Sequence, residues 1–220
     1  MTWNIPTVLT ILRLIASVTI PVAFLVLARP FADWCAMILF VAAAATDWID
    51  GYLARSWKQV TLLGAMLDPI ADKAMVVIAF LVLGIYSSLA VALVLPAALI
   101  LFREVFVSGL REFLGDTAGT LKVTPLAKWK TMVQMVAITV LFAHGIAEHM
   151  FGMAILGMDG ALVGDILDGR EADEVGLGWK LGMMEWTGWG GLILLWLAAA
   201  LTVVTGADYF RKALPHLRGN

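Results

Sequence analysis

Six predominantly apolar stretches of about 20 residues run through this chain, and each is long enough to cross the roughly 30 Å hydrocarbon core of a bilayer as a helix. Backbone groups in lipid must form their hydrogen bonds within the segment, and these stretches are too long for barrel strands. We therefore predict an all-α integral membrane protein with six transmembrane helices. The stretches lie at residues 7–28, 33–54, 64–85, 88–109, 126–147 and 187–208.

The composition excludes several classes of protein. Hydrophobic residues make up 61% of the 220 residues and charged residues 15%, whereas soluble proteins have about 45–50% and about 25%. A net charge of −2 argues against a nucleic-acid partner, and the single cysteine excludes a disulfide framework. We expect one membrane-embedded domain over residues 1–220.

Lysine and arginine in short loops indicate the orientation of a membrane protein, because they concentrate on the cytoplasmic side. The predicted helices place 12 of the 15 basic residues on one side, which predicts that both termini are cytoplasmic. The segment 148–186, between the fifth and sixth helices, carries eight acidic residues and two basic ones. We expect it to lie in the opposite, exoplasmic compartment.

Four aspartates stand where lipid makes a carboxylate costly. Asp47 and Asp50 end the second predicted helix, and Asp68 and Asp72 open the third. Spacings of three and four residues place each pair on one helix face, and the short connection 56–63 allows the pairs to converge. Four converging carboxylates repel one another unless cations lie among them. Such oxygen ligands suit Mg²⁺, Mn²⁺ or Ca²⁺ better than Zn²⁺.

Small residues and one arginine are interleaved with these aspartates. Gly51, Ala54 and Gly64 lack bulky side chains, so a large ligand could approach the helix backbone beside them. Arg55 offers a forked cation for phosphate oxygens next to the metal ligands. The alternative interpretation of the glycines, close helix packing, stays open for each of them taken alone.

The string DWIDGYLARSWKQVTLLGAMLDPIAD, from Asp47 to Asp72, fits the pattern DxxDGxxAR, eight residues, GxxxDxxxD. It resembles the CDP-alcohol phosphatidyltransferases. The resemblance implies their six-helix fold, usually as a homodimer, with an active site near the cytoplasmic face of a bacterial inner membrane. It also implies a metal site of Mg²⁺ or Mn²⁺ on Asp47, Asp50, Asp68 and Asp72, with Asp72 as catalytic base. By the same resemblance, the cytidine diphosphate of the donor is bound by Asp47, Asp50, Gly51, Ala54, Arg55, Gly64 and Asp68.

Three further segments narrow the resemblance within the family: NIPTVLTILR (4–13), REVFVSGLRE (103–112) and AKWKTMVQM (127–135). They are similar to members that transfer the phosphatidyl group of CDP-diacylglycerol to glycerol 3-phosphate. A dianionic acceptor needs cations. We assign Arg103, Arg111 and Lys128 to its phosphate, with Lys130 as a weaker candidate.

Other functions remain open at this point. Cardiolipin synthases and enzymes that use inositol phosphate or serine would share residues 47–72 and differ in the acceptor. A membrane cation transporter could also bury four carboxylates, although it would not need Arg55, Gly51 and Gly64 in this register.

Overall fold

The fold was analysed in a computed structural model, which describes residues 5–57, 61–115 and 126–217, without the side chains of residues 6, 47–57, 127 and 128. Within these ranges all regular structure is helical, as the apolar pattern predicts. Seven helices are described: α1 (Ile5–Val26), α2 (Phe31–Trp57), α3 (Leu62–Tyr86), α4 (Ala90–Leu114), α5 (Leu126–Ala154), α6 (Gly160–Leu167) and α7 (Leu177–Leu217).

Five helices in the described part of the chain are long and apolar enough to cross a membrane: α1, α3, α4, α5 and α7. Helices α3, α5 and α7 contain the predicted stretches 64–85, 126–147 and 187–208, whereas α1 ends two residues before the stretch 7–28 does and α4 begins two residues after the stretch 88–109 does. The predicted stretch 33–54 falls in α2, whose described apolar part is the shorter segment Phe31–Thr46. The membrane-protein class is thus confirmed.

Local sequence explains several helix boundaries. Thr61 is the N-cap of α3, because its hydroxyl accepts a 3.0 Å hydrogen bond from the Gly64 N–H in the first turn. Gly115 follows α4 with a φ of 51°, a left-handed conformation that glycine adopts without a Cβ clash. The Asp173 carboxylate accepts hydrogen bonds from the N–H groups of Leu177 and Gly178, which begin α7. These bonds favour the carboxylate form and lower the pKa of Asp173.

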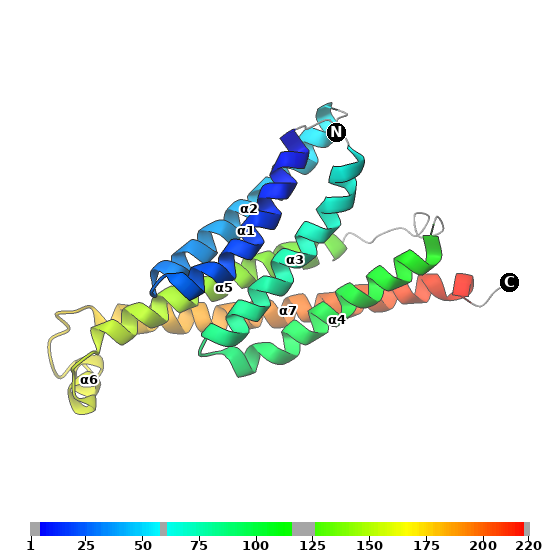
Figure 1. The fold of residues 1–220 in the computed structure, drawn as a ribbon. Coiled ribbons are helices and arrows are strands. Elements are labelled where there is room, and N and C mark those ends of the chain that lie inside the picture. Colours follow the sequence, from blue (N-terminus) through cyan, green and yellow to red (C-terminus); the bar gives the residue numbers. More distant parts are fainter. Residues whose placement is uncertain (1–4, 58–60, 116–125, 218–220) are drawn as a thin grey trace.

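The helices form two groups that cross each other (Figure 1). One group contains α1, which packs against α2 and α3; the other contains α7, which packs against α4 and α5. Contacts of α2 with α5, and of α3 with α4, join the groups. The core between them consists of fully buried side chains such as Phe40, Met75 and Phe142.

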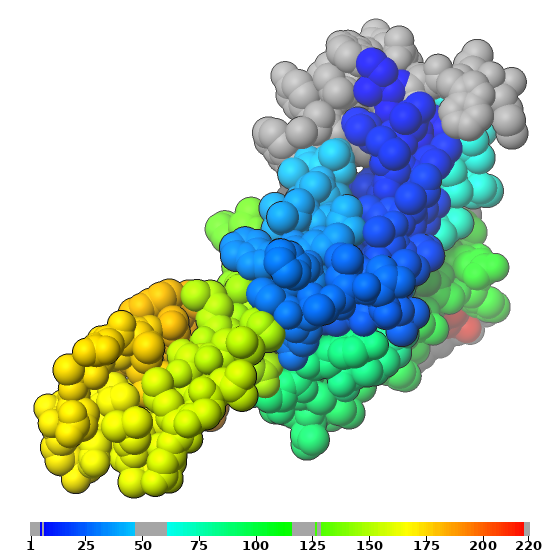
Figure 2. Space-filling view, turned by 60° about the vertical axis from the view of Figure 1, so that its left-hand side comes forward, coloured from blue at the N-terminus to red at the C-terminus, as the bar shows by residue number. Residues whose placement is uncertain are grey.

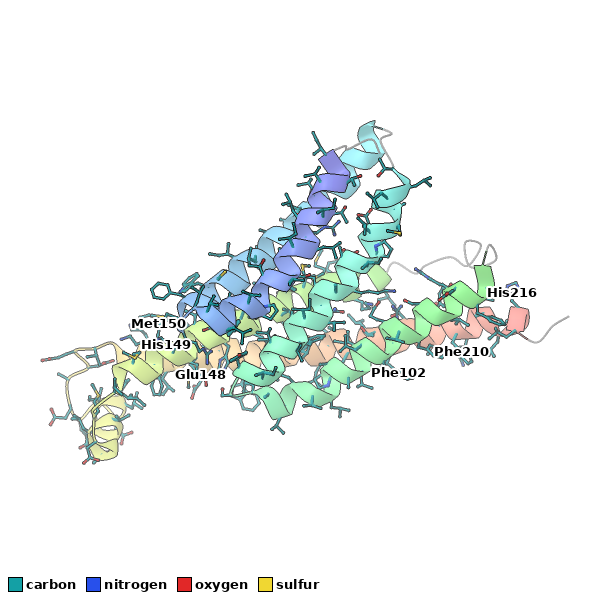
Figure 3. All side chains as sticks on the ribbon, in the orientation of Figure 1. Phe102, Glu148, His149, Met150, Phe210 and His216 are labelled. Carbon is teal, nitrogen blue, oxygen red and sulfur yellow. The ribbon has the colours of Figure 1, made fainter. Side chains whose placement is uncertain are left out.

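The outside of the bundle is apolar, as a lipid-facing surface requires. Large hydrophobic side chains such as Leu25 and Val91 are exposed on it. Phe102 on α4 and Phe210 on α7 lie on one side of the molecule (Figure 3). Phe106 stacks on Phe102 and contacts Phe210, with ring centroids 6.0 and 5.6 Å apart.

An ion pair between a half-buried arginine and a buried aspartate fixes the end of the bundle where α1 is followed by α2. Arg29 donates hydrogen bonds of 2.8 and 3.0 Å to Asp33 and of 3.2 Å to the carbonyl oxygens of Tyr86 and Gly145. The hydrogen bond to the Asp33 carboxylate raises the pKa of Arg29. Gly145 is required there, because a Cβ would lie 2.3 Å from Asp33 Oδ1. Arg29 thus connects α2, α3 and α5.

The segment 148–186 is more helical than its polar sequence indicates. It contains the last turns of α5, the short α6, and the first ten residues of α7, which begins at Leu177 rather than 187. Figure 2 shows these parts projecting as an arm from the other helices, and Figure 1 shows the C-terminal end of α7 far from α6.

Candidate active site

A buried arginine on α1 contacts both aspartates of α3. Arg13 is 2% exposed, and its Nη1 donates a 2.7 Å hydrogen bond to Asp72 Oδ1. Its Nη2 lies 3.4 Å from Asp68 Oδ1. Asp68 and Asp72 are one helical turn apart, and their side chains are 50% and 47% exposed. The guanidinium therefore fixes two carboxylates that remain accessible to a ligand.

Threonines from α1 complete this contact between α1 and α3. Thr10 donates a 2.6 Å hydrogen bond to Asp68 Oδ1. One turn earlier, the hydroxyls of Thr7 and Thr61 lie 2.6 Å apart. Gly64 lies beneath them, since a Cβ there would be 3.3 Å from the Thr7 hydroxyl. The start of α3 is thus held against α1 through polar groups, which places the Asp68 and Asp72 carboxylates on a rigid support.

Asp72 also lines a cavity of about 280 Å³ between α3, α4 and α5. Its polar lining is rich in cations. The lysines and arginines are Lys73 on α3, Arg103 and Arg111 on α4 and Lys130 on α5. Together with two carboxylates, those of Asp72 and Glu104, the four cations leave a formal charge of +2 on the lining. A small dianion is the ligand that such a cavity suits best.

Glu104 organises the cations on one side of the cavity. Its Oε1 lies 3.2 Å from Arg103 Nη1 and forms a short ion pair with Lys130 Nζ. Lys130 is 5% exposed, so this ammonium group would be costly to bury without a carboxylate partner. Lys73 contacts the Ser108 hydroxyl, which in turn donates to the Glu104 carbonyl oxygen. The cationic side chains are therefore held in place before any ligand binds.

The two arginines of α4 that line the cavity pack against helix α7. The Arg103 side chain crosses α7 at Gly206, where a Cβ would lie 2.8 Å from Arg103 Cγ. The Arg111 guanidinium stacks over the Tyr209 ring, with Cζ 5.2 Å from the centroid. Tyr209 is buried and so forms a fixed platform. Gly206 and Tyr209 are three residues apart, on one face of α7.

Much of the predicted donor and metal site lies outside the described side chains. Helix α2 runs through Asp47, Asp50, Gly51, Ala54 and Arg55, but the described side chains do not include these five, nor Lys128 of α5. Among the side chains that are described, no three of His, Cys, Asp or Glu form a group that could hold a metal ion. The four-aspartate metal site stays a prediction.

Comparison with known proteins decides the family. Residues 3–204 match CDP-alcohol phosphatidyltransferase. The chain belongs to this family. A relative from Cereibacter sphaeroides is 56% identical over 99% of both chains, and one from Rickettsia bellii is 36% identical over 94% of both. A third, from Sodalis glossinidius, is 44% identical over 63% of this chain and 76% of its own. All three are named CDP-diacylglycerol–glycerol-3-phosphate 3-phosphatidyltransferase.

In this CDP-alcohol phosphatidyltransferase the structure brings together three of the residues singled out from sequence: Asp72, Arg103 and Arg111 line one cavity. Lys130, the weaker candidate from sequence, lines it as well. Asp68 lies one turn from Asp72 and shares Arg13 with it. Gly64 lies against Thr7 and Thr61.

Sequence reasoning assigned no site role to several residues that the structure places here: Arg13, Thr10, Lys73, Glu104 and Gln134. For Arg13 the signal was its place inside the apolar stretch 7–28, because an arginine there requires a partner.

Proposed function

We propose that this protein transfers the phosphatidyl group of CDP-diacylglycerol to glycerol 3-phosphate, giving phosphatidylglycerophosphate and CMP. The observation that carries the proposal is the cavity itself. A carboxylate suited to act as base, Asp72, lines the same small space as the arginines of α4 and Lys130. A lining charge of +2 complements the phosphate dianion of the acceptor, and the names of the relatives support the same substrates.

The reaction needs one proton transfer and one phosphoryl displacement. Arg103, Arg111, Lys128 and Lys130 bind the acceptor phosphate and orient its primary hydroxyl toward Asp72. Asp72 takes the hydroxyl proton while the oxygen forms a bond to the phosphorus that carries diacylglycerol. The bond from that phosphorus to the CMP oxygen breaks, and CMP departs with the electron pair. Water is a competing nucleophile, so fixing the acceptor by its phosphate also protects the donor.

A divalent cation fits the carboxylates that face the donor. Asp68 and Asp72 supply hard oxygen ligands one turn apart, each about half exposed, which suits Mg²⁺ or Mn²⁺. Asp47 and Asp50 would complete the ligand set. When bound, the cation would offset the charge of the donor diphosphate and make CMP a better leaving group. Gly51, Ala54, Arg55 and Gly64 would line the cytidine diphosphate site between α2 and α3.

The proposal includes a placement in the membrane. Helix α2 crosses the membrane as well and brings the number of spans from five to six. Both termini are cytoplasmic, and the cavity opens toward the cytoplasm of a bacterial inner membrane. The distribution of basic residues supports this orientation. The family resemblance further implies a homodimer, which cross-linking in native membranes would test.

One assay separates this function from the alternatives. Purified protein in vesicles with CDP-diacylglycerol and Mg²⁺ is offered glycerol 3-phosphate, phosphatidylglycerol, inositol phosphate or serine, and CMP release is measured. We expect release with glycerol 3-phosphate alone. Release with another acceptor instead would identify a different synthase of the family, and no release with any acceptor would contradict the enzymatic assignment.

A further inference from the structure

Gln134 is a buried polar residue that the mechanism above does not use. It lies on α5 one turn beyond Lys130, is 4% exposed, and lines the same cavity as Asp72 and the α4 arginines. Its Oε1 is buried and has no hydrogen-bond partner among the described residues. Such a group is destabilising on its own, and in native proteins it commonly marks a place where a ligand or water completes the contact.

The chemistry of the amide suits one part of the acceptor. Glycerol 3-phosphate has a phosphate, a primary hydroxyl that reacts, and a second hydroxyl on C2. The lysines and arginines match the phosphate, and Asp72 matches the reacting hydroxyl. A neutral amide both donates and accepts hydrogen bonds, as a hydroxyl does. The terminal torsion of glutamine is broad and roughly two-fold, so either its oxygen or its nitrogen can face the cavity.

We propose that the Gln134 amide binds the C2 hydroxyl of the acceptor and thereby selects a polyol phosphate over a simpler alcohol phosphate. This inference rests on the proposed function. It extends that function because it assigns acceptor selection to a residue of α5 that carries no charge. Gln134 and Lys130 lie four residues apart, on one face of the helix. The same face then binds the phosphate at one turn and the carbon chain at the next.

The test combines two acceptors with protein variants, so that the interaction between one hydroxyl and one side chain is isolated. The acceptors are glycerol 3-phosphate and 3-hydroxypropyl phosphate, which keeps the phosphate and a primary hydroxyl but lacks the C2 hydroxyl. The main variant is Gln134→Met, which has similar volume and no hydrogen-bonding amide. The matched control is Thr202→Val, because Thr202 of α7 is fully buried, its hydroxyl has no partner among the described residues, and it lies off the cavity.

We expect the wild type to favour glycerol 3-phosphate over 3-hydroxypropyl phosphate by about 3- to 10-fold in kcat/KM, the size of one net hydrogen bond. Gln134→Met should bring this ratio to within about twofold of one, by reducing the use of glycerol 3-phosphate. Thr202→Val should keep the wild-type ratio. If Gln134→Met lowers kcat/KM for both acceptors by the same factor, the glutamine is structural and the inference is wrong.

A second variant decides the question if Gln134→Met does not fold. Gln134→Glu keeps the shape and an accepting oxygen, so the preference for glycerol 3-phosphate should survive while KM rises for both acceptors through repulsion of their phosphates. A ratio of one in this variant would overturn the inference. Failure of the proposed function looks different, because the wild type would then release no CMP with either acceptor.

Discussion

The Arg13 guanidinium donates a 2.7 Å hydrogen bond to Asp72 across the contact between α1 and α3. The proposed base is therefore oriented by a residue 59 positions earlier in the chain. Since the second guanidinium nitrogen lies 3.4 Å from Asp68, one side chain positions both carboxylates of α3.

Replacing Arg13 should impair turnover more than acceptor binding. Arg13→Ala removes a charge-assisted hydrogen bond, and such bonds contribute about 1.5–3 kcal/mol, so we expect kcat to fall by roughly 10- to 150-fold. The KM for glycerol 3-phosphate should stay within a few-fold, because Arg13 does not line the cavity. Steady-state kinetics on purified protein measure both. Lys212→Ala is the control, since its ion pair with Asp208 is partly exposed and contributes little. A raised acceptor KM with unchanged kcat would contradict the positioning role.

Asp72→Asn should abolish turnover while the protein stays folded. The amide oxygen can still accept the Arg13 hydrogen bond, but the amide cannot take a proton at neutral pH. General-base catalysis contributes about 10²- to 10⁴-fold, and we expect a loss in that range. Thermal unfolding and donor binding check the fold. Turnover within about tenfold of the wild type would assign the base to another group.

Chelation should remove activity, and Mg²⁺ or Mn²⁺ should restore it. The reason is that four carboxylates between Asp47 and Asp72 cannot share a site with an anionic donor unless cations offset their charge. CMP release before and after EDTA treatment measures this. Full activity after exhaustive chelation, or restoration by Zn²⁺ alone, would exclude the predicted site.

Arg111→Ala should raise the KM for glycerol 3-phosphate and leave that for CDP-diacylglycerol within a few-fold. Loss of a charge-assisted hydrogen bond predicts a decrease of about 10- to 150-fold in kcat/KM for the acceptor. Arg111→Lys should recover only part of the lost kcat/KM. Lysine keeps the positive charge, but it has neither the forked donors of a guanidinium nor the planar group that stacks on the Tyr209 ring. If both KM values stay the same and only the amount of inserted protein falls, Arg111 merely anchors α4 at the membrane surface.

Gly206→Ala should weaken acceptor binding although it replaces no residue of the cavity lining, because it displaces the Arg103 side chain. The added Cβ would lie 2.8 Å from Arg103 Cγ, so the arginine must move. We expect a higher KM for glycerol 3-phosphate and an unchanged KM for the donor. Gly190→Ala on the same helix is the matched control, because its Cβ would meet no described atom within 4 Å. Equal effects of the two substitutions would indicate a general perturbation of α7.

Sequence patterns predicted those features that depend on residues within a single helix, namely where the helix lies in the chain and which residues share one of its faces. The apolar stretches indicated the long helices because bilayer thickness fixes their length. The eight-residue spacing of Arg103 and Arg111 placed them near one face of α4, and both line the cavity.

Contacts between helices were not predictable in the same way. Spacing within α3 says nothing about which residue of α1 reaches Asp72, and spacing within α4 does not show that Glu104 meets Lys130 of α5. The early start of α7 was missed because residues 177–186 mix apolar, glycine and charged residues, so hydropathy alone does not extend the stretch 187–208.

The long separation between Arg13 and its partners also concerns the synthesis of the protein. Arg13 of helix α1 emerges from the ribosome 55 residues before Asp68 and 59 residues before Asp72 of α3. At that stage the Arg13 charge favours the aqueous interface over the lipid, which resists deeper movement of that end of α1. Once α3 inserts, the same charge is neutralised by Asp68 and Asp72 and becomes buried. The same arginine thus favours the interface while α1 is alone and positions the two carboxylates of α3 once that helix is present.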